Sequence, residues 1–447
     1  MVVTGRLAAA AVLAALFVTL ALPSWLGVLV ATLALAALIG LDLLLLGSPG
    51  ALELSREPLT SVRTGRSIDV ELAVLNGGAR PVRGTLWDDW PPSAHARHRT
   101  HPLNLPPNTR IRLRTELTPA YHGDRVAGPV TLRLLGPLGL AGRQVRREVP
   151  ARLRALPPFR SEPLLASKVK QLQQLEGRNT TTIRGQGTEF DSFREYVAGD
   201  DVRTIDWRAT ARANDVLVRT WRPERNRHVV MLLDTGRVSA GRIGGADNAH
   251  GGGADSAHGG GGTRLDAAIE AALLLGGLAA AGGDSVDLLA YDRRLRTEVR
   301  GVGGKRLQLK LMHALAGLTP ELADTDYRGM LRATLQRARR RSLVVWFTHL
   351  DAATVQEGLR PVLPVLAERH RVLVVSVTDP EVAAAAIHRT GLTDLYTAAA
   401  AENVIAEEAV ARETLRRTGV RVITAPPDLL PGALADEYLE LKRTGAL

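Results

Sequence analysis

The sequence predicts a mixed α/β protein, in which a two-helix transmembrane hairpin and an all-β, sandwich-like domain precede a doubly wound, mostly parallel α/β domain. Three observations support this fold class. Two strongly apolar runs stand near the start of the 447-residue chain. Short strand-like runs broken by turn residues follow up to residue 155, and strand-like and helix-like runs alternate from residue 228 onward. Such alternation is typical of a parallel sheet with helices on both faces.

The two apolar runs, residues 7–22 and 25–46, are separated by a Pro-Ser pair that favours a turn. About 20 apolar residues are needed to cross the hydrocarbon core of a bilayer, so the second run is long enough and the first must recruit the two valines near the start. We therefore assign residues 1–47 to a transmembrane hairpin in the plasma membrane. Asp42, near the end of the second run, is interpreted as an interfacial carboxylate that reaches water.

The charges that flank the hairpin predict its orientation. Arg6 precedes the first run, Arg56, Arg63 and Arg66 follow the second, and the connecting turn carries no charge. Because basic residues concentrate on the cytoplasmic side of membrane proteins, both termini are expected in the cytoplasm. The alternative is a signal peptide over residues 1–22 with Arg6 as its basic start, but no A-x-A-like cleavage site follows.

Residues 48–155 are expected to form the all-β domain. Turn residues such as Gly77-Gly78 and Pro91-Pro92 separate four strand-like runs: residues 67–76, 81–90, 109–117 and 130–136. Short strands at this spacing are typical of a sandwich. No charged pair in this part has catalytic spacing, so a scaffold or an interaction module is the favoured role.

Residues 227–447 are expected to form the α/β domain. The predicted strands are residues 228–234, 285–292, 342–348, 371–378 and 420–425, and the predicted helices are residues 264–281, 326–341 and 354–370. Ligands of doubly wound sheets bind at the carboxyl ends of the strands. Asp234, Thr348 and Thr378 stand at such ends, so they mark the expected binding edge.

A glycine-rich insertion over residues 241–263 interrupts this domain. It contains a tandem duplication, GADNAHGG followed by GADSAHGG, whose His and Asp residues could in principle hold a metal. Glycine loses more conformational entropy on ordering than any other residue, which disfavours a preorganised site. A flexible loop insertion is therefore the favoured interpretation.

The composition excludes several classes of function. The chain has no Cys, which rules out disulfides, thiolate zinc sites, Cys nucleophiles and iron–sulfur clusters. No Walker A loop, H-E-x-x-H helix, G-x-S-x-G elbow or kinase motif set is found either. The net charge of +11 favours anionic partners. It is weak evidence, however, because nearly all the basic residues are Arg in an Ala- and Gly-rich chain, as GC-rich coding produces.

Residues 156–226 form a junction that contains a dense charged stretch at residues 187–212. Six acids are interleaved there with four arginines: Glu189, Asp191, Glu195, Asp200, Asp201 and Asp206 with Arg194, Arg203, Arg208 and Arg212. Because the two signs nearly balance, a nucleic-acid grip is disfavoured. The favoured interpretation is a polar joint, in which Arg–carboxylate pairs lock the stretch against the first strand of the α/β sheet. A partner-docking surface and a carboxylate-dependent hydrolase are the alternatives.

The same stretch resembles the domain-of-unknown-function 58 (DUF58) family. Its "G-x-E-F…R-x-Y…G-D-D-x-R-x-I-D-W…A-R" pattern is matched by Gly187, Glu189, Phe190, Arg194, Tyr196, Gly199, Asp200, Asp201, Arg203, Ile205, Asp206, Trp207, Ala211 and Arg212. The membrane hairpin, the β region and the run at residues 229–237 also follow the family's order.

The resemblance implies a von Willebrand A-like α/β domain, and family members often accompany MoxR-type AAA+ ATPases. No enzymatic reaction is established for the family. The sequence and the resemblance together therefore predict a membrane-anchored, cytoplasm-facing, non-enzymatic adaptor that binds protein, with such an ATPase as the candidate partner.

Many von Willebrand A domains hold Mg²⁺ through a D-x-S-x-S loop, a later Thr and a later Asp. The resemblance places Asp234 at the first acid and Thr325 at the threonine. Gly236 and Val238 stand at the serine positions, and His349 stands where the later Asp is expected. Because three of the oxygen ligands are missing, we expect no cofactor, with Mg²⁺ at Asp234 and Thr325 as the alternative.

Overall fold

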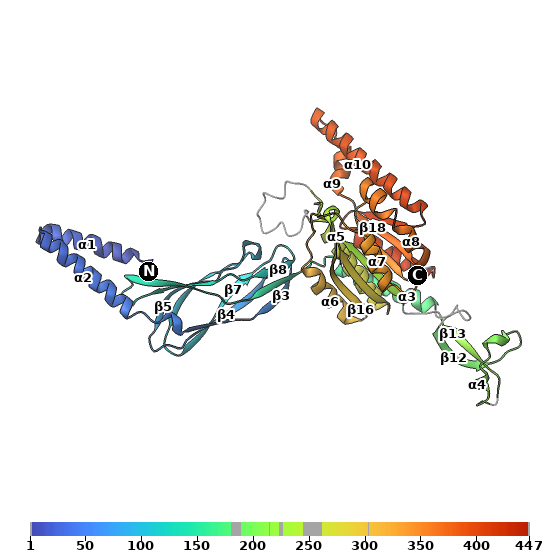
Figure 1. Ribbon diagram of the computed structural model, residues 1–447, viewed down its shortest axis with the longest axis horizontal. Helices are drawn as coiled ribbons and strands as arrows, with labels where there is room; N and C mark the ends of the chain where they lie inside the picture. The colour runs from blue at the N-terminus through green and yellow to red at the C-terminus, as the bar shows by residue number, and fades with distance from the viewer. Residues whose placement is uncertain are drawn as a thin grey trace. The chain divides into compact units, whose positions relative to one another are not determined.

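The computed structural model describes residues 2–179, 189–213, 215–222, 227–244, 262–302 and 304–445. The chain divides into two compact units, Met1–Leu156 and Pro157–Leu447, which Figure 1 shows in one colour gradient. Gly187 and residues 245–261 of the predicted insertion lie outside the described residues. The chain is a mixed helix and sheet protein.

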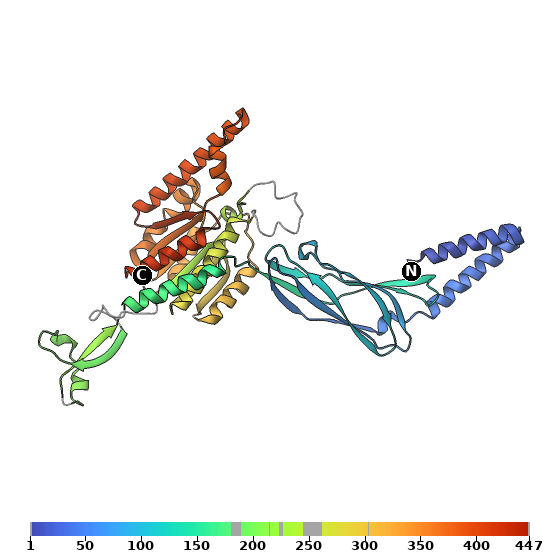
Figure 2. The same ribbon diagram turned by 180° about the vertical axis from the view of Figure 1, so that it is seen from behind.

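Two apolar helices begin the first unit, α1 (Gly5–Ala21) and α2 (Trp25–Leu44), and they lie side by side in both views (Figures 1 and 2). Ser24 begins α2 by accepting a hydrogen bond from the Gly27 N–H at 3.2 Å. Within the described residues, α2 is the one helix long and apolar enough to cross a membrane. α1 is also apolar but has only 17 residues, which is short for a membrane-spanning helix. A second crossing therefore stays a prediction.

The base of the helix pair is hydrogen-bonded to the β domain of the same unit. The Asp42 carboxylate is fully buried and accepts the backbone N–H groups of Leu138, Leu140 and Ala141 at 2.7, 2.8 and 2.9 Å. The expectation that Asp42 reaches water is therefore wrong. The reason is that the tight turn before residue 141 leaves backbone donors without strand partners, and buried donors need an acceptor.

Three sheets make up the β domain in the described part of the first unit. The first contains β1 (Val2–Val3), β10 (Ala141–Arg147), β9 (Val130–Leu135), β5 (Val82–Trp87) and β6 (Thr100–Leu105). The second contains β2 (Leu52–Arg56), β4 (Ile68–Asn76) and β7 (Thr109–Leu117). The third contains β3 (Leu59–Arg63), β11 (Arg152–Leu156) and β8 (Gly123–Val126). Alternate residues of the first two sheets share one core, as Val74 and Leu132 do.

A buried ion pair crosses this domain. The Arg56 guanidinium contacts the Asp88 carboxylate, and both side chains are almost completely buried. Asp88 also accepts hydrogen bonds from Thr115 Oγ1 at 2.7 Å and Trp90 Nε1 at 3.2 Å, while Arg56 donates to the Val149 carbonyl at 2.9 Å. Arg56 therefore does not supply the surface charge that the orientation argument assigned to it.

The second unit is built on a six-stranded sheet in the order β16-β15-β14-β17-β18-β19. Its strands are β14 (His228–Asp234), β15 (Ser285–Tyr291), β16 (Leu295–Val302), β17 (Leu343–Phe347), β18 (Arg371–Val377) and β19 (Arg421–Ala425). All neighbours pair in parallel except β15 and β16, which are antiparallel. The five parallel strands confirm the predicted runs to within a residue at each end.

Helices cover both faces of this sheet. They are α3 (Glu162–Asn179), α5 (Arg264–Ala281), α6 (Lys305–Ala316), α7 (Tyr327–Arg337), α8 (Leu363–Arg369), α9 (Pro380–Ile387), α10 (Leu392–Arg417) and α11 (Leu430–Arg443). The buried residues of α7 and α8 pack on one face with Val230 and Trp346. On the other face α5 contacts β14, β15 and β18 and in turn packs against α3 and α11.

The family-motif stretch forms a separate two-stranded sheet, β12 (Glu189–Glu195) paired antiparallel with β13 (Leu217–Arg222). Between the strands lie a short 3-10 turn, Val202–Thr204, and the one-turn helix α4 (Trp207–Thr210). We call residues 189–222 the motif hairpin. Its strands are missed by sequence patterns because charged residues alternate with aromatic ones and no continuous apolar run marks them.

Candidate functional site

The strand order of the six-stranded sheet reverses at the carboxyl ends of its central strands. The chain runs from β14 to β15 on one side, while β17 pairs with β14 on the other. Ligands of such sheets bind where the strand order reverses. Asp234 is the last residue of β14 and Thr348 follows β17, so two of the three residues predicted to mark the binding edge lie at this point.

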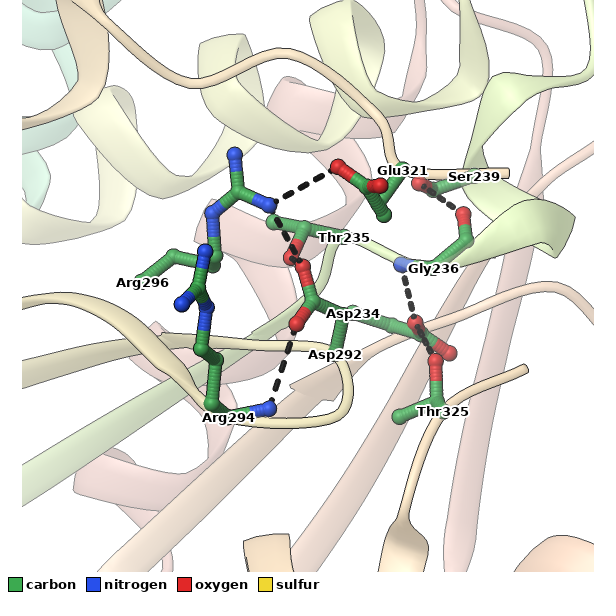
Figure 3. A network of polar contacts seen from close by, with 9 residues as sticks. All are labelled: Asp234, Thr235, Gly236, Ser239, Asp292, Arg294, Arg296, Glu321 and Thr325. Atoms are coloured by element: carbon green, nitrogen blue, oxygen red, sulfur yellow. Dashed lines mark hydrogen bonds and ion pairs between the residues drawn. The ribbon is translucent and has the colours of Figure 1, made fainter. Parts of the chain in front are cut away.

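Asp234 is the centre of a hydrogen-bond network at this edge, part of which is drawn in Figure 3. The Asp234 side chain is 2% exposed. One carboxylate oxygen accepts from Thr325 Oγ1 at 2.6 Å and from the Gly236 N–H at 2.9 Å. The other accepts from Thr348 Oγ1 at 2.8 Å and from the Tyr327 hydroxyl at 3.0 Å.

These four donors balance the burial of the carboxylate. Burial raises the pKa of Asp234, and the hydrogen bonds donated by Thr325, Gly236, Thr348 and Tyr327 act in the opposite direction. A carboxylate that accepts two hydrogen bonds on each oxygen has little capacity left for a further ligand. The fold brings Asp234 and Thr325 together, as the resemblance implies. They meet as acceptor and donor of one hydrogen bond rather than as ligands of a metal.

The residues at this edge do not fit an oxygen-ligated Mg²⁺ ion. A Cβ atom at Gly236 would lie 2.1 Å from Thr325 Oγ1, so a serine cannot stand there while Thr325 bonds to Asp234. The Ser239 hydroxyl donates to the Gly236 carbonyl at 2.7 Å. Within the described residues, no group of three or more His, Asp or Glu residues is placed to hold a metal.

A second buried carboxylate, Asp292, extends the network beyond β15. It accepts from Thr235 Oγ1 at 3.3 Å, the Arg294 N–H at 3.1 Å and Arg296 Nη1 at 3.0 Å. Arg296 also pairs with Glu321 at 3.0 Å, and Figure 3 shows these contacts beside Asp234. Asp292 was missed as a site residue, although it ends the predicted strand at residues 285–292 and the strand-end argument used for Asp234 applies to it.

Thr378 does not join this network. Its backbone N–H donates to the Ala425 carbonyl at 2.9 Å, which continues the pairing of β18 with β19. β18 lies two strands away from β14 in the sheet, so the end of β18 does not reach the Asp234 carboxylate.

Arg264 and His349 form the outer part of the edge. Arg264, at the start of α5, is half-buried, and the one hydrogen bond described for its side chain runs to the Val238 carbonyl at 3.4 Å. Burial lowers the pKa of Arg264, while three nearby carboxylates raise it: Glu408, Asp351 and Asp379. Five N–H donors on a guanidinium leave several of them available for a partner.

His349 stands at the position where the resemblance places an acid. It is 8% exposed, and its Nδ1 atom has no hydrogen-bond partner among the described residues. Burial and the neighbouring Arg264 charge lower the pKa of His349 to about 4, so the imidazole is neutral at neutral pH. His349, Arg264, Ser239 and Asp234 line a cavity of about 20 Å³, which has room for a single water molecule.

In the motif hairpin, the predicted motif acids are used as caps and ion-pair partners. Asp200 pairs with Arg194 at 2.5 Å and accepts the Val197 N–H at 3.0 Å. Asp201 accepts the Arg203 N–H at 3.0 Å. Gly199 has a φ of +113°, a conformation that glycine adopts without strain, so it forms the turn that brings Asp200 back to Arg194.

Asp206 holds the second half of the hairpin. It is 8% exposed, accepts the Arg208 and Ala209 N–H groups at 3.0 and 2.9 Å and forms an ion pair with Arg219 of β13. The hydrogen bonds donated by the Ala209 N–H and the Arg219 side chain hold the pKa of Asp206 below its usual range. Likewise, Arg194 beside Asp200 lowers the pKa of that carboxyl.

The contacts described for the motif residues do not include the predicted joint. Within the described part of the chain, the hydrogen bonds and ion pairs of Arg194, Asp200, Asp201 and Asp206 all run to other residues of the hairpin. Glu189 and Phe190 pair through their backbones with residues of β13. The predicted lock against the first strand of the α/β sheet is therefore not among the described contacts, because each acid finds a donor nearby in sequence.

Comparison with protein families identifies the family to which the chain belongs. The family model described as "Protein of unknown function DUF58" matches residues 192–421, more than half of the chain. Uncharacterised proteins of Mycobacterium tuberculosis and Mycobacterium bovis are 27% identical over 232 residues, which cover 49% of this chain and 67% of each relative.

Solved structures are less similar. A PapD-like domain of human CEP192 is 12% identical with a TM-score of 0.19, and the match covers 24% of this chain and 85% of that domain. An exo-β-N-acetylglucosaminidase from Vibrio harveyi is 11% identical with a TM-score of 0.20, and the match covers 84% of this chain and 75% of the enzyme. At such scores neither similarity bears on fold or function.

Proposed function

The chain belongs to the DUF58 family of proteins of unknown function, and from this starting point we propose that it is a membrane-anchored, cytoplasm-facing adaptor. Its α/β domain, which we take to be von Willebrand A-like, would bind another protein at the carboxyl edge of the six-stranded sheet. A MoxR-type AAA+ ATPase is the candidate partner, because the family resemblance implies one.

The state of Asp234 is the observation that favours an adaptor. All four of its hydrogen bonds are accepted from hydroxyl or N–H donors of the protein itself. A general base needs an oxygen free to take a proton, and a metal ligand needs one free to coordinate. The edge is therefore suited to recognition, for which Arg264 supplies unused donors at its rim.

The exposed helices support the membrane anchor. Large apolar side chains on both helices face outward, among them Phe17 at 61%, Trp25 at 91% and Leu33 at 60% exposed. Such a surface is costly in water but suits the interior of a bilayer. Arg80 donates to the Leu44 carbonyl at the end of α2, and Arg143 is exposed on β10 next to the base. Basic residues at this end favour a cytoplasmic β domain.

Co-purification tests the adaptor proposal. The tagged, full-length protein in mild detergent should retain the MoxR-type ATPase of its own organism, and Arg264→Glu should abolish retention because it reverses the charge at the rim of the edge. Arg110→Glu, at an exposed position of β7, is the matched control and should retain the ATPase. An extract in which no ATPase is bound, or in which both variants bind it equally, would contradict the proposal.

The charge density of residues 189–206 is the support for the hydrolase alternative, and the described contacts of three of its acids add none. Asp200, Asp201 and Asp206 all accept backbone N–H groups, and two of them also pair with arginines. Hydrolysis by the purified protein that is lost in Asp206→Asn would restore this alternative.

A further inference from the structure

The structure changes the charge balance that the sequence suggests for the motif hairpin. Counted along the chain, six acids face four arginines at residues 187–212. In the folded hairpin, Asp200 forms an ion pair with Arg194, and Asp206 forms one with Arg219. Asp201 accepts the backbone N–H of Arg203. The charge available to a partner therefore differs from the charge that the sequence counts.

One loop of the hairpin carries exposed positive charges that are unpaired within the described residues. Residues 202–213, which we call the Trp207 loop, contain a single carboxylate, Asp206, which is buried and engaged. The three arginines of the loop are exposed, and their guanidinium groups make no hydrogen bond or ion pair within the described residues: Arg203, Arg208 and Arg212. The loop thus presents three positive charges without a counter-charge of its own.

The same loop exposes a large aromatic side chain. Trp207 is 66% exposed and Val202 is 60% exposed, although each stands in a turn that is held in place. Asp206 fixes the start of α4 by accepting two backbone N–H groups, and Thr210 Oγ1 accepts the Leu217 N–H at 3.0 Å. Apolar side chains on an already ordered loop lose little entropy when they are covered, which favours binding.

We propose that the Trp207 loop is a docking surface for an acidic segment of a partner protein, with Trp207 as the anchor and Arg203, Arg208 and Arg212 as carboxylate-binding groups. Trp and Arg are the residues most enriched among those that dominate binding energy at protein interfaces. Arginine also binds carboxylates through two parallel hydrogen bonds, which adds orientation to charge attraction. The inference rests on the proposed adaptor role and specifies the chemistry of the partner.

Two features favour an acidic protein over a nucleic acid. Surfaces that bind single strands stack successive bases on several aromatic side chains, whereas Trp207 is the one aromatic residue in residues 202–213. Exposed carboxylates also flank the loop at Glu195 and Asp215, and they would repel a continuous phosphate backbone. An acidic protein segment can place its charges only where the arginines lie.

Fluorescence anisotropy with the detergent-solubilised full-length protein tests the proposal. The probe is a fluorescein-labelled peptide in which Glu alternates with Leu. The controls are the same peptide with Lys in place of Glu, and a labelled oligothymidine. The acidic peptide should bind, and Trp207→Ala should weaken its binding by at least about tenfold, as loss of an anchor does. Arg203→Glu combined with Arg212→Glu should abolish it.

Matched variants in the other unit control for general effects of charge and of aromatic loss. Trp87→Ala removes a Trp that is 42% exposed, and Arg110→Glu reverses an exposed charge on β7. Neither should change peptide binding. Trp207→Phe, which keeps an aromatic ring, should recover part of the affinity lost in Trp207→Ala, and circular dichroism should show the same fold for all variants.

The outcomes separate this inference from the ATPase proposal. Peptide binding that survives both Trp207→Ala and the double Arg variant would overturn the docking surface, as would tighter binding of oligothymidine than of the acidic peptide. If the peptide binds as expected but no MoxR-type ATPase is co-purified, the surface stands and the proposed partner is wrong.

Discussion

At the scale of single residues, Asp234 is a buried carboxylate whose four acceptor positions are filled by the protein's own donors. The donors come from three different segments, the turn after β14, the start of α7 and the end of β17. The residue therefore joins these segments at the carboxyl edge. Gly236 and Thr325 fit only as a pair, because a side chain at residue 236 would collide with the threonine hydroxyl.

We predict that Asp234→Ala lowers the free energy of unfolding of the full-length protein by about 1–3 kcal/mol, since it leaves buried donors without an acceptor. Asp234→Asn should cost less because its amide oxygen still accepts. Chemical denaturation of the full-length protein, followed through the unfolding transition of the second unit, measures the loss of stability in each variant.

Millimolar Mg²⁺ should leave the melting temperature of the wild-type protein unchanged, because the oxygens of Asp234 are occupied. A Mg²⁺-dependent rise in melting temperature that disappears in Asp234→Ala would show instead that the hydroxyls move aside for a cation.

The buried imidazole of His349 predicts a pH dependence. Its folded pKa of about 4 lies below the unfolded value of about 6.5. The folded state thus binds the proton less well than the unfolded chain. Stability is complete above about pH 6.5 and is lost progressively as the pH falls toward 4, by up to about 3 kcal/mol. The Arg264 charge contributes to this effect and the Asp351 carboxylate opposes it.

Urea denaturation across this pH range measures the loss. His349→Gln removes the titrating group and should flatten the profile. His370 is also buried with a lowered pKa, so His370→Gln is the matched control and should leave the His349 part of the slope in place. An identical profile in wild type and His349→Gln would contradict the assignment.

At the scale of elements, continuous apolar runs were the most reliable guide to the fold. β14 and α5 have the predicted bounds, because a fully buried strand and a buried helix both require long apolar sequences. β16, β12 and β13 were missed, since they lie at sheet edges where charged residues alternate with apolar ones. A pattern of that kind is shared with exposed loops.

The candidate site shows a similar division. Asp234 and Thr348 could be found because both follow apolar strands. Tyr327 and Arg264 could not, since their roles depend on which distant segments the fold places beside them. Arg56 was assigned to the surface for the same reason, because the sequence does not reveal that Asp88 is buried opposite it.

The Arg56–Asp88 pair links β2 to the segment after β5, and its burial predicts an asymmetric response to substitution. Asp88→Ala should destabilise the β domain by about 3–5 kcal/mol, because it leaves a buried guanidinium unpaired. The double variant Arg56→Met with Asp88→Asn should cost less, since it removes both charges and keeps an acceptor for Thr115.

Thermal or chemical unfolding of the full-length variants compares the two. If the double variant is as unstable as Asp88→Ala, the loss of stability does not come from leaving Arg56 unpaired. The ion pair itself would then stabilise the β domain. Arg110→Ala, at an exposed position on β7, serves as the neutral reference.

At the scale of the whole molecule, the proposed anchor predicts which parts of the chain a protease can reach. Trypsin added to intact cells should leave residues 50–447 uncut, because both units are expected on the cytoplasmic side. After permeabilisation the same treatment should cleave the chain. Immunoblots with tags at either end measure this, and cleavage of intact cells would favour the signal-peptide alternative.

The attachment of the helices to the β domain has a mechanical consequence. Asp42 accepts three N–H groups of the turn at residues 138–141, and Thr4, just before α1, donates its hydroxyl to the Gly139 carbonyl at 2.6 Å. The start of α1 and the end of α2 are thus both hydrogen-bonded to one turn of the β domain. If the helices lie in a bilayer as proposed, a change in their tilt would therefore also change the orientation of the β domain relative to the membrane surface.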